Sequence, residues 1–174
     1  DGSTHTLRAD LTVACDGRDS LVRTLPELGV RDHATPMDVR WFRIPRHRDD
    51  PPGILFTLDR GRFFILIDRG DYFQAANLIA KGTDAAERAL PIERFEQQLV
   101  EALPWLGQRR IVTDWDDVKL LHVRLDRLRK WHVPGLLCIG DAAHAMSPVG
   151  GIGINLAVQD AVAAARHLAE PLRR

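Results

Sequence analysis

This chain of 174 residues has few cysteines and few aromatic residues, and its formal net charge is zero. Cys15 and Cys138 each lie in a short apolar run, so we expect small buried residues rather than a disulfide or a catalytic thiol. Basic and acidic residues balance at 24 each, which gives no sign of a nucleic-acid partner. No apolar run could span a membrane, the N-terminus is no signal peptide, and the histidines lack metal-ligand spacing. We expect a soluble, cytoplasmic protein without a metal site.

The stretch from 136 to 160 carries the strongest chemical signals. Leu136–Ile139 is a short apolar run, a loop of small residues follows it, and an Ala-rich apolar pattern begins at Ile154. This order predicts a strand, a loop and a helix. Bare backbone in the loop allows close approach of a ligand, and the helix start offers unpaired N–H groups. Asp141 accepts hydrogen bonds from hydroxyl groups. A flavin nucleotide, with hydroxyl groups at one end and a carbonyl-rich ring at the other, fits this arrangement.

Two segments of the chain resemble known motifs. The residues that carry the later one are Gly140–His144, Pro148, Gly150–Asn155 and Asp160-Ala161. The earlier one, Leu11–Arg23, contains Asp16-Gly17 directly after an apolar strand. Together they resemble the two flavin motifs of the FAD-dependent aromatic-ring hydroxylases, the family typified by para-hydroxybenzoate hydroxylase. Because the motifs occur in the family's order and with its spacing, chance is a poor explanation.

The resemblance implies FAD as the cofactor and assigns roles to eight residues. Asp141 would hold a ribityl hydroxyl group. The start of the helix would present backbone N–H groups to the pyrimidine side of the flavin ring. The loop before this helix would pass close to the reacting face of the flavin ring. The residues implied in cofactor binding are Asp16, Gly17, Asp141, Pro148, Gly151, Gly153, Ile154 and Asn155.

For three further residues of the motifs, both a functional and a structural role are considered. Arg18 and Arg23 offer positive charge for a phosphate group, but a solvated arginine and an arginine that stabilises the turn explain them as well. His144 lies inside the later motif, and we expect a structural hydrogen bond from it rather than acid–base work.

The resemblance also implies a reaction. In the family, NADH or NADPH reduces the flavin, and O₂ forms a flavin C4a-hydroperoxide that hydroxylates an electron-rich aromatic ring. No side-chain nucleophile is visible, so no catalytic residue is assigned, and the oligomeric state is open. One alternative is a related FAD-dependent reductase or epoxidase. Another is a non-catalytic fragment that does not hold FAD by itself.

One motif of the family is absent from this sequence. Family members begin with a strand, a Gly-x-Gly-x-x-Gly turn and a helix that bind the pyrophosphate. Nothing before residue 140 fits that pattern. We therefore interpret the chain as an internal portion of a longer enzyme and expect the isolated chain to be inactive.

The chain predicts an α/β fold of mixed α+β character, part of a Rossmann-like FAD-binding domain with an inserted β-sheet substrate domain. Residues 1–29 and 129–174 are expected to form the first and residues 30–128 the second. Strands are expected over Val39–Pro45, Ile54–Leu58, Arg62–Asp68, Tyr72–Ala80 and Val118–Leu125. An amphipathic helix follows Pro91 and ends before Pro104.

Polar residues on these strands are the substrate-pocket candidates: Arg40, Arg43, Tyr72, Gln74 and Asn77. Strand alternation places Gln74 and Asn77 on opposite faces, so one pocket cannot take both. An outward-facing position on a half-buried sheet is the simpler reading of all five.

Overall fold

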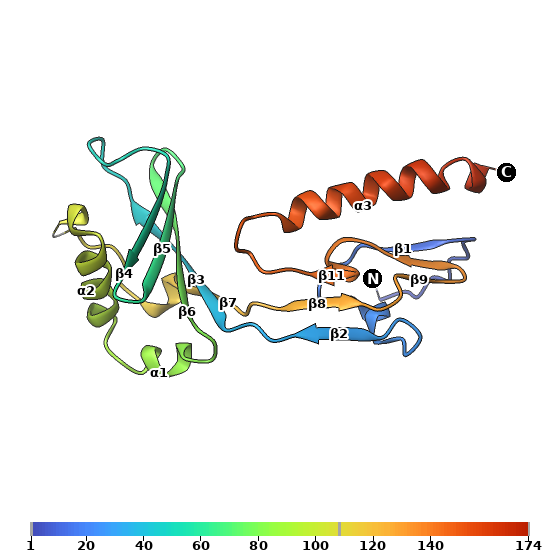
Figure 1. The fold of residues 1–174 in the computed structure, drawn as a ribbon, viewed down its shortest axis with the longest axis horizontal. Helices are drawn as coiled ribbons and strands as arrows, with labels where there is room; N and C mark the ends of the chain where they lie inside the picture. Colours follow the sequence, from blue (N-terminus) through green and yellow to red (C-terminus); the bar gives the residue numbers. More distant parts are fainter. Residues whose placement is uncertain (1, 108, 174) are drawn as a thin grey trace. The chain divides into compact units, whose positions relative to one another are not determined.

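The computed structural model describes residues 2–107 and 109–173, which form two compact units (Figure 1). Unit 1 consists of Asp1–Ala34 and Arg124–Arg174, and unit 2, Thr35–Val123, is inserted between these segments. The boundaries differ by a few residues from those expected after residues 29 and 128. The reason is that β2 (Val30–His33) and β8 (Leu125–Leu128) pair with each other inside unit 1.

Unit 1 contains two small sheets. In the first, β1 (Thr12–Ala14) runs parallel to β10 (Leu136–Cys138), and β9 (His132–Val133) pairs with β10 in the antiparallel sense. In the second, β8 lies between β2 and β11 (His144–Ala145), and both neighbours are antiparallel to it. The parallel pair is the part of a Rossmann-like arrangement that the sequence predicts.

Helical segments complete unit 1. The short helices are η1 (Leu21–Thr24), η4 (Gly140–Ala142) and η5 (Pro171–Arg173), and the long helix is α3 (Gly153–Leu168). The helix expected from Ile154 is confirmed, and it begins one residue earlier, at Gly153. No helix in the described ranges is long and apolar enough to cross a membrane.

Unit 2 is built on a five-stranded antiparallel sheet of order β4-β5-β6-β3-β7. Its strands are β3 (Met37–Pro45), β4 (Ile54–Asp59), β5 (Arg62–Asp68), β6 (Tyr72–Ala80) and β7 (Lys119–Leu121). Two helices, α1 (Asp84–Arg88) and α2 (Ile92–Ala102), and the short helices η2 (Pro104–Leu106) and η3 (Trp115–Asp117) follow. The four strands expected between residues 39 and 80 are confirmed, although β3 and β6 each contain a run of three buried residues.

One face of this sheet packs against α2 and forms the core of unit 2. Phe95 and Leu99 of α2 are buried against Phe42, Phe64 and Phe73 of the sheet. The two rings Phe42 and Phe95 meet edge to face with centroids 5.3 Å apart. The expected amphipathic helix is therefore confirmed, and its apolar side determines which sheet face is covered.

Two local expectations are wrong. The strand expected over Val118–Leu125 is two strands, β7 and β8, because the N–H of Val123 donates to the carboxylate of Asp38 (2.9 Å) instead of to a neighbouring strand. Cys15 is exposed, since it lies just beyond the end of β1. Cys138 is buried as expected, and burial raises the pKa of its thiol.

Candidate functional site

The parallel pairing of β1 and β10 brings the two motifs to one edge of the sheet. Thr12, Val13 and Ala14 pair with Leu136, Leu137 and Cys138. The N–H of Ile139 donates to the carbonyl oxygen of Ala14 (3.0 Å), which carries the pairing beyond the last strand residue. Asp16-Gly17 and Gly140-Asp141 follow directly, so both carboxylates lie at the carboxyl ends of parallel strands, the usual place for ligands in α/β folds.

Asp16 is an exposed carboxylate at the start of a tight turn. Gly17 has a φ of +90°, and its carbonyl oxygen accepts the N–H of Ser20 (3.0 Å). The Ser20 side chain lowers the pKa of Asp16 below its ordinary value, and the N–H of Leu21 adds to this effect. Asp16 is therefore ionised at neutral pH and open to a ligand with hydroxyl groups.

Asp141 lies in η4 with a side chain that is about one-third exposed, at 36%. Arg18 approaches it from the earlier motif, with 3.8 Å between Nη2 and Oδ2. Gly140 has a φ of +59°, and a Cβ there would lie 3.1 Å from the Cβ of Ala157 in α3. Glycine is therefore required at this position, both by the backbone conformation and by the close approach of α3.

Arg23 connects the two motifs. Its Nη1 donates to the carbonyl oxygens of Arg18 (2.9 Å) and Asp141 (3.3 Å), and its Nη2 pairs with the buried carboxylate of Asp126. Of the two readings left open for Arg23, the structure supports the structural one. Sequence reasoning missed Asp126, because nothing in the local pattern of β8 marks it as the partner of a residue 103 positions earlier.

His144 and Asp160 form a second, partly buried contact within the later motif. His144 Nε2 and Asp160 Oδ2 are 2.6 Å apart, and the same oxygen accepts the N–H of Gly140 (2.9 Å). The structural hydrogen bond expected of His144 is thereby confirmed, and it ties α3 to β11 and η4.

The loop before α3 exposes bare backbone and ends in an uncapped helix. Gly150 and Gly151 have φ values of +86° and +63°. The residue before α3, Ile152, provides no side-chain cap, and the first intrahelical bond runs from the N–H of Leu156 to the carbonyl oxygen of Ile152 (3.1 Å). The N–H groups of Gly153, Ile154 and Asn155 therefore have no intrahelical acceptor and lie at the positive end of the helix dipole.

This arrangement fits a flavin nucleotide. A Cβ added at Gly151 would meet no protein atom within 4 Å, so the space over the loop is open to a flat ring. Asp141 and Asp16 supply acceptors for hydroxyl groups, and the first turn of α3 supplies donors for ring carbonyl groups. In residues 2–107 and 109–173, no group of three or more His, Cys, Asp or Glu side chains is arranged to hold a metal ion.

The five substrate-pocket candidates in unit 2 lie on opposite faces of the sheet. Arg43, Tyr72 and Gln74 lie on the face away from α2, where a groove of about 780 Å³ runs along β3 and β6. Arg43 stacks on the Tyr72 ring at 4.6 Å, and Gln74 donates to the carbonyl oxygen of Phe42 (3.2 Å). The open face therefore offers aromatic surface and polar groups together.

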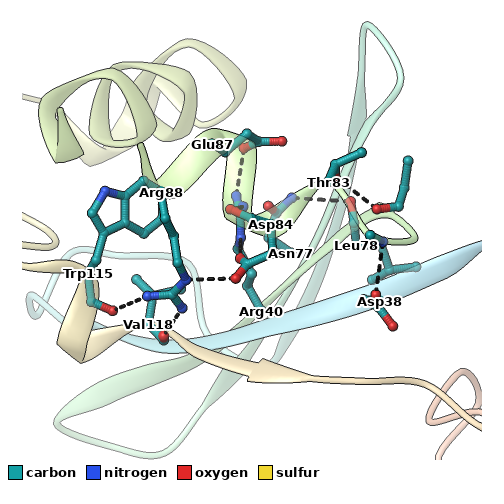
Figure 2. Close-up of polar contacts among 12 residues, drawn as sticks. Asp38, Arg40, Asn77, Leu78, Thr83, Asp84, Glu87, Arg88, Trp115 and Val118 are labelled. Atoms are coloured by element: carbon teal, nitrogen blue, oxygen red, sulfur yellow. Dashed lines mark hydrogen bonds and ion pairs between the residues drawn. The ribbon is translucent and has the colours of Figure 1, made fainter. Parts of the chain in front are cut away.

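Arg40 lies on the sheet face that the helices cover, where its ion pairs stabilise the fold (Figure 2). It is fully buried, and its guanidinium group donates to Asp84 (2.6 Å) and Glu87 (2.6 Å) of α1. Arg88 also binds Asp84 (2.7 Å), so one carboxylate joins two guanidinium groups. Asn77 is buried on the same face as Arg40, directly opposite it in the neighbouring strand. Neither residue can reach the groove on the open face.

Curated relatives found by sequence comparison include monooxygenases. The 6-methylpretetramide 4-monooxygenase of Streptomyces rimosus is 37% identical over 173 residues, which are 97% of this chain and 41% of the relative. A kynurenine 3-monooxygenase of Stenotrophomonas maltophilia is 30% identical over 194 residues, covering 98% of this chain and 40% of the relative. The chain thus spans about two-fifths of the length of these relatives.

Solved structures show the same fold. The structure of pqsL, a probable FAD-dependent monooxygenase from Pseudomonas aeruginosa, matches 94% of this chain and 47% of its own with a TM-score of 0.76 at 21% identity. The flavin-dependent halogenase CmlS matches 99% of this chain and 32% of its own, with a TM-score of 0.80 at 15% identity. The family model described as "FAD binding domain" matches residues 1–174, and the chain belongs to that family.

Proposed function

We propose that this chain is the FAD-binding portion of an NAD(P)H-dependent monooxygenase that hydroxylates an aromatic or similarly electron-rich small molecule. The observation that carries the proposal is that one unit holds both Asp141 and a bare glycine loop leading into the uncapped start of α3. The names of the curated relatives support the reaction class. Because the reaction consumes NAD(P)H, we place the enzyme in the cytoplasm.

The residues of unit 1 divide the work of holding the cofactor. Asp141 accepts a hydrogen bond from a ribityl hydroxyl group, and the N–H groups of Gly153, Ile154 and Asn155 bind the pyrimidine side of the ring. These donors at a helix start stabilise negative charge on that side. Pro148 and Gly151 leave the reacting face free of large side chains. Asp16 and Gly17 contact the ribityl and pyrophosphate part.

Bound FAD supplies the redox chemistry, taking electrons from NAD(P)H and activating O₂. The chain's own residues bind and orient reactants, and no side chain is assigned as an acid, base or nucleophile. In unit 2, the groove with Arg43, Tyr72 and Gln74 supports an aromatic substrate, because it combines a ring surface with hydrogen-bonding groups.

Titration of FAD into the protein tests the cofactor site, with quenching of flavin fluorescence as the signal. We expect Asp141→Ala to weaken binding about tenfold, since a hydrogen bond to a charged acceptor is lost. Asp19→Ala is the matched control, because it removes an exposed carboxylate of the same unit that has no proposed contact with FAD. Equal affinity of the wild type and Asp141→Ala would remove Asp141 from the site.

The reaction class is tested separately, with ¹⁸O₂ and a panel of phenolic and anilinic substrates. Incorporation of one labelled oxygen atom into the product supports a monooxygenase. Oxidation of NAD(P)H with substrate turnover but without label in the product would point to a reductase or dehydrogenase instead. Because the sequence lacks the glycine-rich turn, we expect turnover only from a longer polypeptide that contains this chain.

A further inference from the structure

Two arginines face each other across the second sheet of unit 1. The register of β2 and β8 places Arg31 directly opposite Arg127. Directly opposite residues share one sheet face, with Cβ atoms about 4.5–5.5 Å apart, and like charges at such positions destabilise the pair. Both side chains are exposed. An anion bound nearby would relieve this repulsion.

In the described part of the chain, no side-chain carboxylate is paired with either arginine. Asp32 and Asp126 occupy the alternate register position and therefore lie on the opposite face, where Asp126 pairs with Arg23. Within residues 2–107 and 109–173, no carboxylate forms an ion pair with any of four exposed cations of this region. These cations are Arg31, Arg127, Arg129 and Lys130.

A groove of about 620 Å³ adjoins this pair. Seven residues line it, of which four are basic and none is acidic: Arg127, Arg129, Lys130, Trp131, His132, Val133 and Pro134. The backbone beneath the basic residues is held in place, because the N–H groups of Arg129 and Lys130 donate to the carbonyl oxygens of Gly29 (2.8 Å) and Leu28 (3.0 Å). The cations therefore project from an ordered segment rather than from a loose loop.

The side chain of Arg127 is also oriented by contacts with neighbouring rings. Its guanidinium group lies 5.1 Å from the centre of the Trp131 ring, which in turn packs against His144 with ring centroids 5.0 Å apart. His144 is fixed by Asp160. Stacking leaves the N–H groups of a guanidinium free to bind in its plane, so Arg127 is oriented for an anion before one arrives.

We propose that this groove, formed by Arg127, Arg129, Lys130 and His132 and flanked by Arg31, binds a diphosphate group. Arginine matches the oxygens of a phosphate with two parallel hydrogen bonds, and lysine adds a point charge. A diphosphate is favoured over a single carboxylate because three permanently charged side chains, Arg127, Arg129 and Lys130, line the groove. Free pyrophosphate and the diphosphate of a nucleotide share this chemistry.

The groove is distinct from the flavin site. Side chains alternate along β8, so Asp126 points toward Arg23 while Arg127 points to the other face of the sheet. None of the seven residues that line the groove is among the eight proposed to bind FAD. The proposal for the groove therefore does not rest on the proposed function. Only the identification of the nucleotide as NAD(P)H would rest on it.

Calorimetric titration of the protein with inorganic pyrophosphate, ADP and NADPH tests the proposal at low and at high salt. We expect pyrophosphate to bind, and we expect Arg127→Ala and Lys130→Ala each to weaken binding about tenfold or more, as the loss of charge-assisted hydrogen bonds predicts. Arg127→Lys should lose less affinity for pyrophosphate than Arg127→Ala does, because lysine keeps the positive charge although it cannot form the two parallel hydrogen bonds. Arg166→Ala is the control, since it removes an exposed arginine of unit 1 from the far end of α3.

The arms of the experiment also separate the sources of the diphosphate. Tighter binding of ADP or NADPH than of pyrophosphate identifies a nucleotide, and equal or weaker binding identifies free pyrophosphate. FAD affinity should be unchanged in Arg127→Ala, which distinguishes failure of this proposal from failure of the flavin assignment. If none of the three anions binds, or if Arg127→Ala and Lys130→Ala bind pyrophosphate as well as the control does, the groove is not an anion site.

Discussion

Arg23 shows how one side chain can hold two motifs that are far apart in sequence. It is 6% exposed and donates to Arg18, to Asp141 and to the carboxylate of Asp126. We expect Arg23→Met to lower the free energy of unfolding by about 3 kcal/mol, because the buried carboxylate of Asp126 keeps only the N–H of Ala145 (3.3 Å) and the more distant Arg124 (3.9 Å). Urea unfolding at neutral pH, followed by circular dichroism, measures this loss.

The surface pair Arg124–Asp19 is the matched control. Arg124 also lies 3.9 Å from the buried Asp126, so the pair is broken at Asp19, which is 84% exposed. Asp19→Asn should cost less than about 1 kcal/mol. Replacing both partners of the buried pair, as in Arg23→Met with Asp126→Leu, should restore part of the stability that Arg23→Met loses. Equal losses for Arg23→Met and Asp19→Asn would show that burial gives the Arg23 contact no special weight.

At the scale of elements, the segment from η4 to the start of α3 contains two glycines with different structural roles. Gly140 and Gly151 have similar positive φ values of +59° and +63°. A Cβ at Gly140 would lie 3.1 Å from Ala157, whereas a Cβ at Gly151 would meet no protein atom within 4 Å. Both alanine variants pay roughly 1–2 kcal/mol of backbone strain, so Gly140→Ala should be the less stable by the added contact with α3.

The two variants should rank in the opposite order for FAD affinity, so that Gly151→Ala, the more stable of the two, loses more of it. Gly151→Ala places a methyl group in the space proposed for the flavin ring, so we expect it to weaken FAD binding beyond what its stability loss explains. Thermal unfolding without FAD and fluorescence titration with FAD measure the two effects on the same samples. Wild-type FAD affinity in Gly151→Ala would move the ring away from this loop.

The same scale shows how far the sequence could predict the structure. The β-branched, aromatic and other apolar residues typical of strands were sufficient to predict Val39–Pro45 and Tyr72–Ala80, and spacing of apolar residues was sufficient for α2. The motif residues Asp16 and Asp141 lie at strand ends, as predicted, because a local pattern of strand, glycine and carboxylate determines that position. Each of these features depends on neighbours within a few residues.

What the sequence could not predict depends on contacts between distant segments. The pairs Arg23–Asp126 and Arg40–Asp84 join different elements, and no periodicity signals either. Arg40 was a pocket candidate because it is a charge on an apolar strand, but α1 covers it with two carboxylates. The opposition of Arg31 and Arg127 follows from strand register, which turn chemistry and packing determine together.

At the scale of the whole molecule, buried carboxylates that hold their elements together through ion pairs are concentrated in unit 2. Burial alone would raise the pKa of Asp38 and Asp84, but hydrogen bonds to Asp38 from Lys81 and to Asp84 from Arg40 outweigh it and lower both values. Arg109, which binds Asp50 with two hydrogen bonds, lowers the pKa of that carboxyl group as well. In each case the folded state binds protons more weakly than the unfolded chain does.

The consequence is acid-sensitive stability in unit 2. The stabilisation from these carboxylates is fully present above their ordinary pKa of 3.8 and is lost as pH falls below that value toward the folded pKa. We expect the melting temperature of unit 2 to fall steeply between about pH 4 and pH 2.5. Trp131→Phe confines tryptophan fluorescence to unit 2, because the remaining tryptophans, Trp41, Trp105 and Trp115, all lie there. Asp50→Asn in that background should melt lower at neutral pH and lose less on acidification, since one of the titrating groups is gone. A melting temperature that stays constant down to pH 2.5 would show that these ion pairs do not stabilise the unit.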